Sequence, residues 1–190
     1  MKQKQLLFIG LGNYPDQYKH TRHNIGKDFL LFLYDNLFQE KKLYLIHEEI
    51  INAQNCIFII PQSYMNTSGD IFKDNYLKKI TLEGNVTVII IHDDLEVPFG
   101  KYRLRNNKER GERGHNGNRS INLALKSIQK ENYKQPYYLS IGIGRPNDGI
   151  IDKWVLKKFY SAEVSNLEND IYPNIKNELI QIIKFIIINS

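Results

Sequence analysis

The sequence has a single cysteine, Cys56, so no disulfide can join two parts of the chain. A chain without disulfides fits a reducing compartment. The apolar run in the C-terminal tail, FIII, has four residues, whereas a membrane-spanning helix needs about 20. The first residues lead straight into a strand-like segment, without the apolar core and cleavage site of a secretory signal. We expect no membrane association and a cytoplasmic protein, or one of an organelle stroma or matrix if a transit peptide was removed.

The length and composition are those of a globular protein. A chain of 190 residues is long enough for one well-packed domain and short for two. Hydrophobic residues make up 42% and charged residues 25%, which is ordinary for such a domain. We expect one domain spanning residues 1–190, present as a monomer.

The positive charge is concentrated in one segment. The chain has a formal net charge of +5, and the segment from Lys101 to Arg119 alone holds seven Lys/Arg and two Glu. Everything outside this segment is therefore neutral in sum. A focused basic stripe predicts binding of a polyanion at this place. The alternative is a solvated charged loop, with residues 106–114 (NNKERGERG) as its centre.

Strand-like and helix-like segments alternate along the chain. Short apolar segments at 6–11, 56–60 and 86–92 predict buried strands, 100–105 and 137–143 alternate more, and 47–53 is a candidate edge strand. Helical periodicity starts at residue 24 and recurs at about 68–79, 117–130 and 173–188. This alternation predicts the α/β class, with a largely parallel or mixed sheet flanked by helices.

Polar side chains follow the predicted strands at the point where each strand ends. Asn13, Asn66 and Asp93 come after three strands, and His115 and Asn116 come after the basic segment. In open α/β sheets, ligands bind beyond the carboxyl ends of the strands. We therefore expect these side chains to converge on one reaction centre.

Two histidines, His20 and His23, precede the first predicted helix, and Asn24 follows directly. A helix N-terminus disfavours a protonated imidazole and would keep a histidine base neutral, whereas a carboxylate such as Asp93 would oppose this effect. Asparagine is also a common helix cap, so Asn24 and Asn66 could serve that local purpose instead.

Other chemistries fit the sequence less well. GLGNYP has Pro15 where a dinucleotide fingerprint needs its third glycine, and there is no G-x-S-x-G elbow for a serine nucleophile. A metal site could draw on His20, His23, His92, Asp93, Asp94 and His115, but none forms H-E-x-x-H or a comparable spacing, so we predict no metal. The chemistry that remains is activation of water by a histidine base that has a carboxylate partner.

Five segments, in order, resemble those of the bacterial-type peptidyl-tRNA hydrolases: IGLGNYPDQYKHTRHNIGKDF, PQSYMNTSG, HDDLEVPFG, RGHNG and SIGIGRP. The resemblance runs to about residue 160. It implies a single α/β domain with a twisted mixed sheet. It also implies cleavage of the ester between a stalled peptide and its tRNA, with peptidyl-tRNA as the partner and no cofactor.

The resemblance assigns a role to individual residues. His23 matches the catalytic base, Asp93 the carboxylate that supports it, and Asn13 a residue near the attacked carbonyl. Positions that bind the substrate or shape its cleft are matched by Tyr18, Met65, Asn66, His115 and Asn116, and positions that bind tRNA phosphate by Arg103 and Arg105. His20 matches no role, so we expect it at the surface or the rim of the site.

Three segments depart from the family pattern. The loop before GHNG is longer and more charged, GNYP replaces GNPG, and Ser140 stands where many members have a tRNA-binding arginine. Arg145 or the charged loop could replace that arginine. Relatives of this family also serve in RNA splicing, so a non-catalytic RNA-binding module on the same fold is the alternative function.

Overall fold

A six-stranded mixed sheet forms the centre of the computed structural model, which describes residues 5–14, 16–37, 49–51, 56–73, 86–106, 114–129, 134–147 and 149–188. The strands are β1 (Gln5–Gly10), β2 (Glu49–Ile51), β3 (Cys56–Ile59), β4 (Val86–Asp94), β5 (Tyr102–Arg105) and β6 (Tyr137–Gly142). Their order in the sheet is β2-β3-β1-β4-β6-β5. The four inner strands are parallel, and β2 and β5 lie antiparallel at the two edges.

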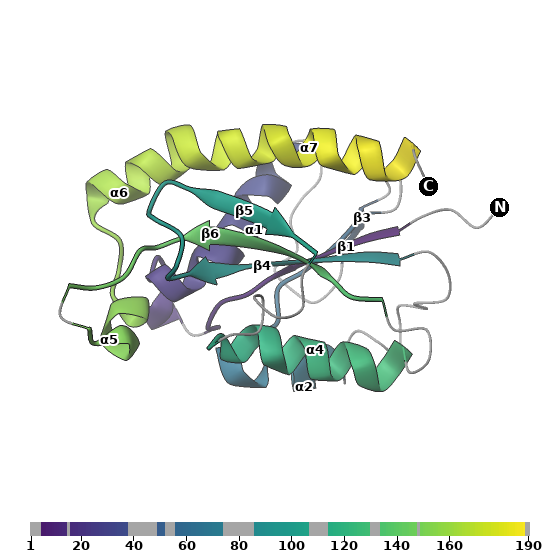
Figure 1. Ribbon diagram of the computed structural model, residues 1–190, viewed down its shortest axis with the longest axis horizontal. Coiled ribbons are helices and arrows are strands. Elements are labelled where there is room, and N and C mark those ends of the chain that lie inside the picture. The colour runs from purple at the N-terminus through teal and green to yellow at the C-terminus, as the bar shows by residue number, and fades with distance from the viewer. Residues whose placement is uncertain are drawn as a thin grey trace.

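Helices cover both faces of the sheet (Figure 1). Helices α1 (Ile25–Leu37) and α7 (Tyr172–Ile188) lie over one face, and α2 (Ser68–Ile71) and α4 (Asn116–Gln129) lie over the other. Two short helices, α5 (Ile151–Leu156) and α6 (Ser161–Asn166), come before a π-helical turn at Leu167–Ile171 that leads into α7. Among the described residues, no helix combines the length and the apolar character needed to cross a bilayer.

Alternate residues of the inner strands build two apolar layers. On β1, Leu6 and Phe8 pack with α1 and α7, whereas Leu7 and Ile9 pack with residues of α4 such as Ile121. Successive side chains of a strand point to opposite faces, so a continuous apolar run is the pattern of a strand that is covered on both sides. Burial of both layers holds the strand ends in fixed relative positions.

The predicted α/β class and the mixed sheet are confirmed. Each predicted strand is present, and the weak candidate at 47–53 contains the edge strand β2. Helix α2 begins at Ser68 as predicted, while residues 74–79 of that prediction lie outside the described residues. The sequence did not predict α5 and α6, because six residues make fewer than two turns and show little apolar periodicity.

The first turn of α1 is pressed against the ends of β1 and β4. A Cβ atom on Gly26 would lie 2.2 Å from the carbonyl oxygen of Ile91, so only glycine fits there. The Leu11 N–H donates to Ile91 O at 3.0 Å, and the Lys27 N–H donates to Leu11 O at 2.8 Å. This close packing sets the turn before α1 beside the carboxyl end of β4.

Candidate active site

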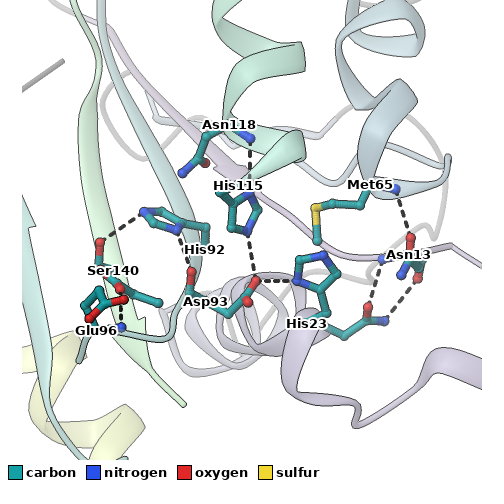
Figure 2. Close-up of polar contacts among 11 residues, drawn as sticks. Asn13, His23, Met65, His92, Asp93, Glu96, His115, Asn118 and Ser140 are labelled. Carbon is teal, nitrogen blue, oxygen red and sulfur yellow. Dashed lines mark hydrogen bonds and ion pairs between the residues drawn. The ribbon is translucent and has the colours of Figure 1, made fainter. Parts of the chain in front are cut away.

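Two histidines donate to one carboxylate oxygen at the carboxyl end of β4 (Figure 2). His23 Nδ1 lies 2.7 Å from Asp93 Oδ1, and His115 Nε2 lies 2.9 Å from the same atom. His23 comes from the 3-10 turn Arg22–Asn24, and His115 directly precedes α4. The Asp93 side chain is only 3% exposed. Three segments that are distant in the sequence thus meet at one buried carboxylate.

The hydrogen bonds distinguish the histidines from one another. His115 Nδ1 accepts from the Asn118 N–H at 3.2 Å, so both of its ring nitrogens are in use. His92 donates from Nδ1 to the Asp93 carbonyl at 2.7 Å and accepts at Nε2 from Ser140 Oγ at 3.0 Å. His23 Nε2 has no partner among the described residues. Only this ring, of those at the centre, has a nitrogen free to take a proton from water.

His20 lies outside the cluster, as expected for a residue of the surface or rim. Its side chain is 46% exposed, and Nδ1 is 3.6 Å from the Asp28 carboxylate. The backbone of His20 has a positive φ of 59°, which turns the chain between the 3-10 turns. Of the two histidines before α1, His23 is therefore the one that the fold brings to Asp93.

The charges of the cluster set its protonation states. Burial opposes protonation of His23, but the charge and hydrogen bond of Asp93 outweigh it and raise the pKa of His23. Burial opposes ionisation of Asp93, but its interactions with His23 and His115 are stronger, so the pKa of Asp93 is lowered. Burial and the neighbouring His115 lower the pKa of His92 to about 3, which keeps His92 neutral. The net shift of the His23 pKa is therefore upward, in the direction that the sequence suggested for the carboxylate and opposite to the one it suggested for a helix N-terminus.

Asn13 is held rigidly beside this cluster (Figure 2). Its Oδ1 accepts from the Met65 N–H at 2.8 Å. Its backbone N–H donates to Asn24 Oδ1 at 2.8 Å, and Asn24 Nδ2 donates back to the Asn13 carbonyl at 3.0 Å. Asn24 therefore clamps the Asn13 backbone through its side chain, and the capping alternative for Asn24 is wrong. The Nδ2 group of Asn13 has no partner among the described residues and is a free donor of fixed direction.

The predicted substrate-binding residues surround the cluster at different depths. Met65 is buried, whereas Asn66 and Asn116 are exposed and line one groove together. Helix α2 has no side-chain cap hydrogen bond, so nothing supports the capping alternative for Asn66. Tyr18 packs edge-on against Tyr64, the residue before Met65, with ring centroids 6.3 Å apart.

Arg103 and Arg105 lie two residues apart on the edge strand β5 and therefore share a face of the sheet. Arg103 pairs in register with Ser140 of β6. Ser140 is 8% exposed and bonds to His92, so this side chain is used inside the protein. Arg145 forms an ion pair with Glu96. Most of the charged loop lies outside the described residues.

Arg22, which precedes His23, anchors the turn and was missed in the sequence. Its guanidinium is fully buried, donates to both carboxylate oxygens of Glu163 at 2.9 and 2.8 Å, and lies 3.9 Å from the ring centre of Trp154. A further bond joins it to the Lys158 carbonyl at 2.8 Å. Arg22 thereby ties the turn that carries His23 to the segment of α5 and α6, about 140 residues away. Only a spatial contact could reveal this role, since a lone Arg–Glu pair has no sequence signature.

His23, Asp93 and His115 also form a group that could hold a metal ion. One potential ligand atom from each lies within 4.8 Å of the others. However, the two imidazole nitrogens contact the same carboxylate oxygen at hydrogen-bond distances, so each would have to give up its proton and move for a metal to bind. Hydrogen bonding alone accounts for the arrangement.

A mixed α/β sheet with an aspartate-supported histidine at its carboxyl edge is the arrangement of a hydrolase that activates water. A family model described as Peptidyl-tRNA hydrolase matches residues 7–187. The chain belongs to the peptidyl-tRNA hydrolase family, as the resemblance in its motifs predicted.

Similar proteins and solved structures agree with this family assignment. The peptidyl-tRNA hydrolase of Helicobacter pylori (strain P12) is 36% identical over 180 residues, which cover 91% of this chain and 85% of that protein. The Wolinella succinogenes peptidyl-tRNA hydrolase is also 36% identical over 180 residues, with 92% and 85% covered. The crystal structure of peptidyl-tRNA hydrolase from Acinetobacter baumannii has 26% identity and a TM-score of 0.68, covering 96% of this chain and 88% of that one. The hydrogenase maturating endopeptidase HybD from E. coli, at 12% identity and a TM-score of 0.52, shares the fold alone.

Proposed function

We propose that this chain hydrolyses the ester bond between peptide and tRNA in peptidyl-tRNA, and so returns tRNA from stalled translation. One observation carries the proposal: His23 has its Nδ1 fixed by Asp93 at 2.7 Å and its Nε2 free among the described residues. This is the arrangement of a general base whose tautomer is set by a carboxylate. Membership of the peptidyl-tRNA hydrolase family supplies the substrate.

The reaction needs only water and the residues of the cluster. His23 Nε2 takes a proton from water as the water oxygen attacks the ester carbonyl carbon. The Asn13 Nδ2 donates to the oxyanion that forms, a contact typically worth roughly 3 kcal/mol in the transition state. The intermediate then collapses, the bond to the tRNA 3′ oxygen breaks, and the imidazolium returns its proton to that oxygen. No covalent enzyme intermediate and no metal take part.

Asn66 and Asn116 give the enzyme a preference for blocked substrates. Both amide side chains are exposed at the groove next to the cluster and can pair with a peptide group as donor and acceptor. An unblocked aminoacyl-tRNA has a charged amine where the first peptide bond would be. It leaves these amides unpaired, which is costly in a binding site.

Arg103 and Arg105 bind tRNA phosphates from the face that they share on β5, with affinity that depends on salt and little on sequence. Such contacts suit an enzyme that accepts many tRNAs. The match of the family model to residues 7–187 supports one domain over residues 1–190. A monomer in the cytoplasm completes the proposal, since stalled peptidyl-tRNA arises where translation occurs.

Release of tRNA from an N-acetylated aminoacyl-tRNA, measured both without and with chelator, tests the proposal. Wild type should be active, His23→Ala should lose at least about a hundredfold in rate, and the matched variant His20→Ala should be near normal. If wild type binds tRNA but cleaves nothing, the chain is the RNA-binding module instead. Loss of wild-type activity on adding chelator would favour a metal at His23, Asp93 and His115.

A further inference from the structure

A groove of about 490 Å³ opens between α2 and α4, and the proposed function uses only the end of it that holds two asparagines. One end holds Asn66 and Asn116, the two asparagines assigned to the first peptide group. From there the groove continues along the outer side of α4 as far as Ser127. It is therefore continuous with the place where the ester and the first peptide bond lie.

The wall of the groove is one face of α4. Its lining residues on this helix are Asn116, Arg119, Ser120, Leu123, Ala124 and Ser127. Their spacing of three and four residues places them in a single stripe over three turns. With a rise of 1.5 Å per residue, the stripe is about 16 Å long. An extended chain advances about 3.3 Å per residue, so about five residues of peptide span the groove.

The floor of the groove is formed where the two helices approach closely. The Gly69 N–H donates to Ser120 Oγ at 2.9 Å. A Cβ atom on Gly69 would lie 2.1 Å from the Ser120 carbonyl oxygen, so only glycine permits this approach. The hydrogen bond and the close contact fix the width of the groove, which is thus shaped before any substrate binds.

The side chains at the rim are exposed and chemically distinct. Lys73 and Arg119 carry positive charge, and neither forms an ion pair with another residue that the structure describes. Asp70 is the one acidic residue of the lining, so the rim has an excess of one positive charge. Leu123, which also lines the groove, is 61% exposed and offers an apolar contact. Acidic and apolar side chains complement such a rim.

We infer that this groove binds the part of the peptide that precedes the residue esterified to tRNA, about five residues in extended form, and that it favours acidic side chains there. The inference rests on the proposed function, because it names the peptide sequences that the same site accepts best. The contacts at the ester itself do not depend on the peptide sequence. The groove adds a preference for the charge of the residues upstream of the ester.

The order of the strands separates this groove from the tRNA-binding arginines. Asp93 lies at the carboxyl end of β4, an inner strand of the sheet. The segment of Asn66 and α2 follows β3 on one side of β4, and Arg103 and Arg105 lie on β5 at the edge on the other side. With the ester at the centre, tRNA and peptide leave in opposite directions. This arrangement favours peptide over RNA as the occupant of the groove.

Three substrates that differ only in the peptide test the inference: N-acetyl-aminoacyl-tRNA, and two pentapeptidyl-tRNAs with the same last residue and either acidic or basic upstream residues. Wild type should prefer the acidic over the basic peptide by roughly three- to tenfold in kcat/KM, since exposed ion pairs are individually weak. The double variant Lys73→Glu/Arg119→Glu should reverse this preference. The matched control Lys176→Glu, on α7 over the other face of the sheet, should keep it.

The outcomes separate the inference from the proposed function. If the double variant loses the same factor on all three substrates, Lys73 and Arg119 contact tRNA and the inference is overturned. Equal kcat/KM of wild type for the acidic and basic peptides also overturns it, while cleavage of the N-acetylated substrate upholds the function. If no substrate is cleaved, the function itself fails.

Discussion

The buried cluster around Asp93 and the groove along α4 are neighbours, since His115 belongs to the cluster and Asn116 lines the groove. The two regions differ in how their polar side chains are paired. In the cluster, the Asp93 carboxylate and both ring nitrogens of His115 are hydrogen-bonded inside the protein. Two groups, His23 Nε2 and Asn13 Nδ2, have no partner among the described residues. In the groove, the charged side chains Lys73 and Arg119 are exposed and form no ion pair with the described residues.

This difference matches the two parts of a peptidyl-tRNA. The ester and its neighbouring groups are the same in every substrate, so fixed and desolvated groups can be aimed at them with no cost of reorganisation. The upstream peptide varies from one substrate to the next. Exposed side chains with long stems adapt to it and discriminate weakly. The following substitutions should therefore affect every substrate alike if they fall in the cluster.

Asn13→Asp should have the largest effect. The new side chain still accepts from the Met65 N–H but replaces the free amide donor by a negative oxygen that repels the oxyanion. We expect kcat to fall by roughly a hundred- to a thousandfold, equally on N-acetylated and pentapeptidyl substrates. Single-turnover tRNA release measures this rate. A loss of less than threefold would show that Asn13 does not contact the oxyanion in the transition state.

His115→Asn should have a moderate effect with a distinct pH signature. Asparagine can still accept from the Asn118 N–H at the start of α4 but is too short to reach Asp93. Asp93 then interacts with His23 alone and stabilises its protonated form more strongly. The acid limb of kcat/KM should move to higher pH, with a loss of less than tenfold at its plateau. A limb that stays in place would show that His115 does not influence the base.

Arg105→Ala should have the smallest effect and should depend on salt. Loss of one phosphate contact lowers the slope of log affinity against log salt concentration by about one. Binding of deacylated tRNA at several salt concentrations measures this slope, with Lys176→Ala as the control. An unchanged slope would mean that this face of β5 does not contact the tRNA backbone.

The strands and the convergence of the polar residues could be predicted from the sequence, because covered strands are apolar throughout and loops of parallel strands meet at one edge. The local sequence pattern did not predict the roles of residues whose contacts are distant in the sequence. Asn24 looked like a helix cap, but its amide bonds to the backbone of Asn13. His115 was assigned to the cleft, and its bond to Asp93 could not be predicted because hydrogen-bond partners across elements leave no spacing signal.

The surroundings of Ser140 show the same limit. The resemblance marked this position as the place of a missing arginine, but could not show what the serine does instead. In the structure, Ser140 bonds to His92, which in turn donates to the Asp93 backbone carbonyl. The substitution thus falls on a chain of hydrogen bonds that ends at the backbone carbonyl of Asp93, whose carboxylate bonds to His23.

The pH dependence of kcat/KM for wild type and Asp93→Asn tests the central claim, that His23 is a base supported by Asp93. Only neutral His23 can accept a proton, so activity is present above its pKa and lost as the pH falls through it. Asp93 raises this pKa in wild type, so the acid limb should lie above the ordinary histidine value of about 6.5. In Asp93→Asn only burial remains, so the rate should fall by about a hundredfold or more and the limb should move below 6.5. An acid limb that does not move, or that moves to higher pH, would contradict the account.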